Sequence, residues 1–122
     1  MTIERHGTTR RYSDVVAFGA TVHLVEVAQS LDADITTQTR EVLASVERTL
    51  IRAGSDKSRL LQVTLYLADI ADIGAMNAVW DDWVPAGTAP ARACVEAKLA
   101  NPGYRIEAVV LAARARPGSE FL

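Results

Sequence analysis

Apolar residues near the start of the chain follow a pattern that predicts two strands. β-branched residues and leucine between positions 14 and 27 flank the small pair Gly19-Ala20, and they include Val15, Val16, Val22, Leu24 and Val27. Residues of this type favour extended structure, and a small-residue pair between two such runs is typical of a tight turn. We therefore expect two short strands joined at residues 19–20.

The apolar period lengthens to three and four positions in two later segments, which is the helical spacing. The first segment covers residues 35–53 and follows Asp34, a residue type that caps helix starts. Gly54 comes next and can adopt the left-handed conformation that ends a helix. The second segment follows Asp72 and ends at residues 85–87, where proline and glycine interrupt helical structure. The apolar positions are Ile35, Val42, Leu43, Val46 and Leu50 in the first helix and Ile73, Met76, Trp80 and Trp83 in the second.

Three further strands are predicted in the second half of the chain. Residues 60–68 alternate between apolar and polar side chains, and we expect the odd-numbered residues from Leu61 to Leu67 to face the core. Residues 91–99 and 104–114 also alternate. The residues between them, 100–103, contain Asn-Pro-Gly and predict a turn that pairs these two strands as a hairpin.

The order of these elements indicates an α+β fold. Strand, strand, helix, strand, helix, strand, strand fits one mixed sheet with two helices on one of its faces. No linker or low-complexity stretch divides residues 1–122, so we expect a single domain. The sheet face opposite the helices carries Gln62, Thr64 and Tyr66 beside apolar residues, which predicts packing against other subunits.

The composition of the chain argues against nucleic-acid and membrane partners and favours one cellular compartment. The 122 residues include 13 basic and 15 acidic side chains, a formal net charge of −2, and no basic block that would follow a phosphate backbone, so we expect no nucleic-acid partner. The polar N-terminus and the lack of any apolar run approaching about 18 residues predict neither a secretion signal nor a membrane partner. Cys94 is the only cysteine, which excludes an internal disulfide and favours a cytoplasmic location.

The predicted hairpin would gather charged residues on one face. A register across the 100–103 turn puts Glu96 opposite Glu107, with Arg92 and Cys94 on the same face. Two facing carboxylates repel one another unless one is shielded or its pKa is raised. An arginine, a cysteine and a carboxyl on one rigid face can form a site, although each alone is typical of a surface charge or, for Cys94, of a small buried hydrophobe.

No pattern for a metal or an organic cofactor is present in the sequence. His6 and His23 are isolated from one another and from any acidic residue at a ligand spacing. The seven glycines are scattered and form no phosphate-binding loop. We therefore expect the protein to work with neither metal nor cofactor.

Two segments carry a resemblance to a known family. The run Ala89-Pro90-Ala91-Arg92-Ala93-Cys94-Val95-Glu96, followed by Arg105-Ile106-Glu107-Ala108, resembles the signature of the reactive-intermediate deaminase family, RidA/YjgF. Further matches lie at residues 11–16, 31–34 and 76–84, and they look most like the YoaB-like branch. The resemblance covers nearly the whole chain.

The resemblance implies a fold, an assembly and an activity. It implies a chorismate-mutase-like fold, a homotrimer and ligand sites in the clefts between subunits. Members hydrolyse reactive enamines and imines to 2-oxo acids and ammonia, without a cofactor. By position, Arg92 looks like the arginine that binds the substrate carboxylate and Glu107 like the residue that holds the attacking water, while Tyr12 and Cys94 look like pocket walls. Many members have Ser or Thr followed by Gly where this chain has Val25-Glu26; a Glu26 that faced the cleft would disfavour dicarboxylate substrates.

Three readings of the function remain open. An enamine/imine deaminase is favoured, because a planar guanidinium offers a carboxylate two parallel donors and a carboxylate can orient water. Arg92 lies four residues from Glu96, about 13 Å along a strand; it must therefore lean over Cys94, or the site must combine two chains. The alternative is a non-catalytic or chaperone-like trimer that binds small carboxylate metabolites. RNA cleavage is a third reading, which the net charge of −2 disfavours.

Overall fold

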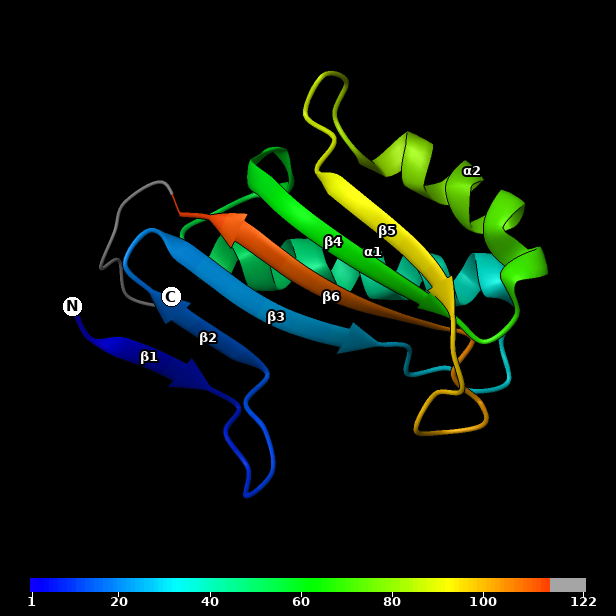
Figure 1. The fold of residues 1–122 in the computed structure, drawn as a ribbon, viewed down its shortest axis with the longest axis horizontal. Coiled ribbons are helices and arrows are strands. Elements are labelled where there is room, and N and C mark those ends of the chain that lie inside the picture. Colours follow the sequence, from blue (N-terminus) through cyan, green and yellow to red (C-terminus); the bar gives the residue numbers. More distant parts are fainter. Residues whose placement is uncertain (115–122) are drawn as a thin grey trace.

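The computed structural model describes residues 1–114 and contains one six-stranded sheet and two α-helices (Figure 1). The strands are β1 (Ile3–His6), β2 (Val15–Phe18), β3 (Thr21–Val27), β4 (Leu60–Leu67), β5 (Ala91–Glu96) and β6 (Ile106–Ala113). The helices are α1 (Ile35–Arg52) and α2 (Ile73–Trp83), with short 3-10 turns at Lys57–Arg59 and Ile70–Asp72. Within this part of the chain, neither helix is long and apolar enough to span a membrane.

Helix α1 forms where its sequence predicts. It begins at Ile35 after Asp34, whose side chain accepts a hydrogen bond of 2.8 Å from the backbone N–H of Thr37. The hydrogen bonds from Thr37 lower the pKa of Asp34 below its ordinary value. The helix ends at Arg52, and Gly54 follows with a φ of 83°, the left-handed conformation expected of it.

Helix α2 also forms as predicted, but its start differs in detail. Asp72 occupies the N-cap position without making a side-chain hydrogen bond to the helix. The carboxylate of Asp69 instead accepts a hydrogen bond of 2.9 Å from the N–H of Ala71, and so caps the 3-10 turn that leads into α2. Met76 and Trp80 form the buried side of this helix.

The predicted hairpin between residues 91–99 and 104–114 is wrong. The sheet order is β1-β2-β3-β6-β4-β5: β5 lies at an edge and pairs in parallel with β4, whereas β6 lies between β3 and β4 and is antiparallel to both. Parallel neighbours need a crossover connection, and α2 supplies it between β4 and β5. Glu96 therefore pairs with Leu67, while Glu107 lies between Val27 and Tyr66, so the two carboxylates are not opposite one another.

Strand β1 was not predicted, because its sequence has no apolar alternation. It pairs with β2 at the other edge of the sheet. A buried arginine also holds it: Arg114 Nη1 donates to Glu4 Oε2 over 2.8 Å, and Arg114 Nε and Nη2 donate to the carbonyl of Gly19 over 3.0 and 2.6 Å. Backbone pairing and this ion pair, rather than apolar burial, place β1.

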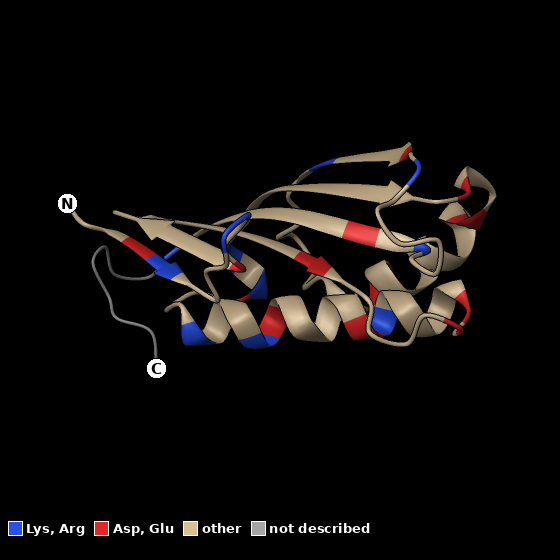
Figure 2. Cartoon of the chain, turned by 90° about the horizontal axis from the view of Figure 1, so that it is seen from below, with Lys and Arg blue, Asp and Glu red and all other residues tan. Residues whose placement is uncertain are grey.

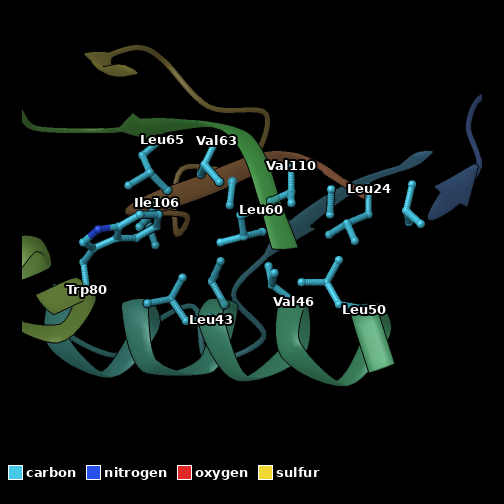
Figure 3. Close-up of a cluster of buried hydrophobic side chains, with 14 of the residues drawn as sticks. Leu24, Leu43, Val46, Leu50, Leu60, Val63, Leu65, Trp80, Ile106 and Val110 are labelled. Carbon is cyan, nitrogen blue, oxygen red and sulfur yellow. The ribbon is translucent and has the colours of Figure 1, made fainter. Parts of the chain in front are cut away.

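The core lies between α1 and one face of the sheet. Figure 3 shows Leu43, Val46 and Leu50 of α1 pointing toward sheet residues such as Val63 and Val110. In strand β4 the odd-numbered residues face this core as predicted, except for Leu61, which is exposed because the register shifts between Leu60 and Gln62. The predicted alternation of buried and exposed side chains in β4 is therefore interrupted only at this shift in register.

The other face of the sheet carries no helix in the described part of the chain, and Figure 2 shows the helical layer on one side only. This confirms the expected mixed sheet with both helices on one face. Val25, Val95 and Val109 lie on the helix-free face and are each about two-fifths exposed, at 45%, 42% and 38%. We call this surface the open face below.

Candidate functional site

Arg92 lies on the edge strand β5 and faces the helices. It pairs with Val63, which is buried in the core, so the two side chains share the helix-covered face. The guanidinium carbon of Arg92 lies 5.0 Å from the ring centroid of Trp80 in α2. Within residues 1–114, this ring contact is the one interaction that holds the cation, since no carboxylate and no hydrogen-bond acceptor meets it. The guanidinium donors are therefore free to bind a ligand.

Cys94 shares the face of Arg92, two residues along β5. Its half-buried side chain packs against the core, where it pairs with Leu65. Burial raises the pKa of the Cys94 thiol, and the positive charge of Arg92 opposes part of that increase. The side chain is therefore a neutral thiol at neutral pH, which suits a pocket wall better than a nucleophile.

Glu107 lies on the opposite face of the sheet. It pairs with Val27 on one side and Tyr66 on the other, and its half-buried side chain belongs to the open face. Because side chains of one face stay on that face across the sheet, Arg92 and Glu107 of one chain point in opposite directions. The expected sharing of one face by these residues is wrong, and only a second chain could bring both to one ligand.

Glu96, the carboxylate predicted opposite Glu107, has a local structural partner instead. Its Oε1 accepts a hydrogen bond of 3.1 Å from the N–H of Ile70 at the start of the 3-10 turn before α2. The contact ties the end of β5 to the crossover that leads into it.

Tyr12 belongs to the loop between β1 and β2. The loop is closed by backbone contacts, since the N–H of Thr9 donates to the carbonyl of Tyr12 over 2.7 Å and the Thr9 hydroxyl accepts from the N–H of Tyr12 over 3.2 Å. The Tyr12 side chain itself is 61% exposed. The loop thus presents the phenol to solvent.

Glu26 lies on the helix-covered face of β3, toward α1. The hydroxyl of Thr49 donates to Glu26 Oε1 over 3.3 Å, and burial raises the pKa of the carboxyl. Glu26 lines a polar hollow of about 490 Å³ together with Asp14, Ser45 and Arg52. Glu26 and Cys94 occupy one cross-strand row but lie three strands apart, about 14 Å. The structure does not bring Glu26 next to Arg92 or Glu107.

One residue of α2 that the sequence did not single out as a site residue contacts Arg92, and a second lies one turn away on the same helix. Trp80 is the ring beneath Arg92, and Asn77 lies one turn earlier on the same helix. The side-chain oxygen of Asn77 is buried and has no hydrogen-bond partner within residues 1–114. A buried acceptor left unpaired is costly, so it marks a position where an N–H donor from outside the described chain would be favoured. The sequence signals were the family match at residues 76–84, which includes both residues, and their spacing of three positions.

The open face has a shallow hollow of its own. It measures about 480 Å³ and is lined by apolar residues of the central strands together with a few polar groups, among them Asp14, His23, Gln62 and Thr64. An apolar surface with interspersed polar groups fits association with another chain. Within residues 1–114, no three His, Cys, Asp or Glu side chains are grouped so that they could hold a metal ion.

The sequence matches one protein-family model over almost the whole described chain. The model is that of endoribonuclease L-PSP, matched by residues 2–114. The RutC family protein YoaB of Escherichia coli K12 is 45% identical over 113 residues, which cover 93% of this chain and 99% of YoaB.

Solved structures give the same picture. A protein of Pseudomonas aeruginosa superposes with a TM-score of 0.90 at 40% identity, covering 93% of this chain and 99% of that one. NMB1025 of Neisseria meningitidis, a member of the YjgF family, gives a TM-score of 0.88 at 43% identity, covering 93% of this chain and 96% of its own. The expected α+β, chorismate-mutase-like fold is thereby confirmed.

Proposed function

This chain belongs to the RidA/YjgF family, described as endoribonuclease L-PSP, and we propose that it is an enamine/imine deaminase. The proposed substrates are short-lived 2-imino acids or their enamine tautomers. Water adds to the imine carbon, the C–N bond of the adduct then breaks, and the products are a 2-oxo acid and ammonia. We place this reaction in the cytoplasm, as the single cysteine favours.

The observation that carries the proposal is the unpaired guanidinium of Arg92. It lies at a sheet edge over Trp80, and no carboxylate of residues 1–114 neutralises it. A planar guanidinium binds a carboxylate through two parallel N–H donors, and every 2-imino acid carries a carboxylate beside the reacting carbon. Binding that carboxylate would fix the position of the imine carbon relative to a water molecule.

The proposed base is Glu107 of a neighbouring subunit. Its carboxylate has no hydrogen bond or ion pair within the described chain, and it lies on the open face, where apolar valines favour association. We propose a homotrimer in which Arg92 of one subunit and Glu107 of the next meet in a cleft. Glu107 would accept a proton from the attacking water and return it to the nitrogen, which gives the hydroxy-amino adduct. It would then take the hydroxyl proton of that adduct and pass it to the nitrogen as the C–N bond breaks, so that a 2-oxo acid and ammonia leave. No metal or cofactor is needed for this step.

The remaining predicted residues are assigned to the walls of that cleft. Cys94 shares the face of Arg92 and would be supplied by the same subunit as that arginine. Tyr12 projects from its exposed loop, and we assign it to the neighbouring subunit that supplies Glu107. Glu26 faces α1 in its own subunit, so the effect on substrate charge that we propose for it acts through long-range repulsion and not through contact with the ligand. Its exchange in Glu26→Gln should raise kcat/KM for imines of dicarboxylic amino acids more than for those of monocarboxylic ones, because one negative charge is removed.

The direct test generates imino acids with an amino-acid oxidase and follows the loss of trapped imine. Arg92→Lys loses the paired donors and should lower kcat/KM by about 10- to 100-fold. Glu107→Gln should lower kcat by about 100-fold or more. Arg59→Lys, which alters an exposed arginine paired with Asp56, is the matched control and should match the wild type. Equal rates for the wild type and Arg92→Lys would reject the role of Arg92.

A mixing experiment tests the two-chain site. Arg92→Lys and Glu107→Gln proteins, each impaired alone, are unfolded together and refolded as mixed trimers. If each site uses Arg92 from one subunit and Glu107 from another, about one quarter of the sites in a random mixture carry both wild-type residues, and activity should return to that extent. Activity that stays at the level of the separate variants would exclude a shared site.

Two alternatives are separated by the same proteins. A non-catalytic trimer that binds carboxylate metabolites would bind 2-oxo acids through Arg92 without accelerating imine loss. RNA cleavage is suggested by the name of the family model. The net charge of −2 and the mixed charges visible in Figure 2 disfavour it, since RNA grooves are basic. RNA degradation lost in both Arg92→Ala and Glu107→Ala would support that alternative.

A further inference from the structure

The ring of Trp80 is a rigid wall beneath Arg92. Trp80 is 6% exposed and lies on the buried side of α2 together with Met76. Figure 3 shows its ring directed into the core near Ile106 and Leu65. Trp83, the next aromatic residue on the helix, lies 5.8 Å away with its ring tilted by 48°. Packing therefore fixes the indole before any ligand binds.

Arg92, in contrast, is an exposed residue on an edge strand. An arginine with no partner would sample many rotamers and would have to be ordered whenever it bound a carboxylate. The indole face attracts the guanidinium through its negative π-surface, with 5.0 Å between the guanidinium carbon and the ring centroid. That attraction uses no N–H donor, so all five remain available.

The neighbouring thiol leaves the cation unpaired. Burial raises the pKa of Cys94, so the side chain nearest to Arg92 along β5 is not an anion at neutral pH. A thiolate there would compete with a carboxylate for the guanidinium. The aromatic ring thus holds Arg92, and the neutral thiol on the same face does not neutralise its charge.

We propose that Trp80 is a positioning residue that holds Arg92 in the orientation in which it binds the carboxylate of the substrate. This inference rests on the proposed function, because it concerns the carboxylate-binding arginine of the same site. Trp80 acts through Arg92 and does not itself touch the reacting atoms. Its removal should weaken binding of any small 2-oxo or 2-imino acid by the same factor, whatever the rest of that acid is.

The helix provides a matched control in Trp83. It is the same residue type one turn further along α2, and it also has a cation over its ring, with Lys57 Nζ 5.7 Å from the centroid. Its indole N–H donates to Glu47 Oε1 over 3.2 Å. Trp83 makes no ring contact with Arg92 within residues 1–114, but its ring packs beside that of Trp80. Trp83→Phe keeps an aromatic ring at that position and is therefore the closer control for losing a tryptophan from α2.

The test compares Trp80→Leu and Trp80→Phe with Trp83→Leu and Trp83→Phe. Trp80→Leu should raise KM for the imine about fivefold and Trp80→Phe about twofold, with kcat changed less than KM. The Trp83 variants should leave both constants unchanged from the wild type. Trp80→Phe keeps a smaller aromatic ring beneath the guanidinium, so its effect on KM can still be measured if Trp80→Leu folds poorly.

A double-mutant cycle separates positioning from general packing. In an Arg92→Ala background, Trp80→Leu should no longer weaken binding, because the residue it positions is gone. A loss that persists undiminished in that background, or equal losses in the Trp80 and Trp83 variants, would overturn the proposal.

A binding measurement keeps this result distinct from the proposed catalysis. Calorimetric titration with 2-oxobutanoate needs no turnover and is carried out on the same variants. If the wild type binds 2-oxobutanoate and Trp80→Leu binds it about fivefold more weakly, the positioning role is supported even if no imine hydrolysis is found. Unchanged binding in Trp80→Leu, or no binding by the wild type, refutes it, whereas absent hydrolysis alone refutes only the deaminase.

Discussion

Replacing Gln38 with methionine should destabilise the protein by about 3 kcal/mol, since the side chain makes three hydrogen bonds that net about 1 kcal/mol each. Gln38 is fully buried in α1. Its Nε2 donates to the carbonyls of Ser30 and Gly103 over 3.0 and 2.9 Å, and its Oε1 accepts from the N–H of Arg105 over 2.8 Å. One side chain therefore joins the loop after β3 to the loop before β6.

The magnitude comes from the hydrogen bonds alone, because methionine is close to glutamine in volume and leaves little cavity. Three backbone groups lose their partner, and each unpaired group costs about 1–3 kcal/mol unless water reaches it. Partial access of water in the two loops keeps the expected sum near the lower end. For a chain of this length, about 3 kcal/mol corresponds to a decrease in Tm of about 10 °C.

Urea unfolding at one fixed protein concentration measures the change, because any assembly would make the midpoint concentration-dependent. Gln29→Met is the matched control: Gln29 is exposed and should change the free energy of unfolding by less than about 0.5 kcal/mol. Hydrogen exchange should accelerate at Arg105, whose amide loses its acceptor. A cost below about 1 kcal/mol, or unchanged exchange at Arg105, would refute the reasoning that these hydrogen bonds hold the loops.

Three further changes test separate parts of the structure. Burial raises the pKa of Glu26 above its ordinary 4.5, so the folded state binds that proton more tightly than the unfolded chain, and this contribution to stability, present below the unfolded pKa, is lost as pH rises through the folded pKa. Glu26→Gln should therefore gain stability relative to the wild type as the pH rises above about 4.5, the ordinary pKa of this carboxyl, and urea unfolding that shows no relative gain would contradict the cause assigned to the shift. Glu4→Gln should cost about 2 kcal/mol, because Arg114 is buried and loses its charged acceptor, and a thermal melt unchanged from the wild type would mean that the ion pair does not hold β1. Asp34→Ala should lower Tm by about 4 °C while Asp34→Ser retains most of the cap, and equal melting of both variants would exclude the capping role.

Local features of this protein could be predicted from its sequence because they depend on residues close together in the chain. Helix α1 was expected over residues 35–53 and forms over 35–52, since a 3.6-residue apolar period, Asp34 and Gly54 all act within one helical turn. The odd-numbered core face of β4 was predicted for the same reason and changed only where the register shifts near Leu61. The family motifs around Arg92 and Glu107 are likewise short runs of sequence, and they identify these two residues as site candidates.

Strand order and the relative position of the candidate site residues were decided only by the tertiary structure. An alternating segment determines which side chains share a face, but not which strand lies beside it, and β5 pairs with β4 because α2 returns the chain in the parallel direction. The same pairing puts Arg92 over Trp80 on the helix-covered face and Glu107 on the open face. Sequence thus determined the helices, the alternation of side chains within most strands and the chemistry of single residues, whereas packing over long sequence separations determined that one chain keeps its arginine and its carboxylate on opposite sides of the sheet.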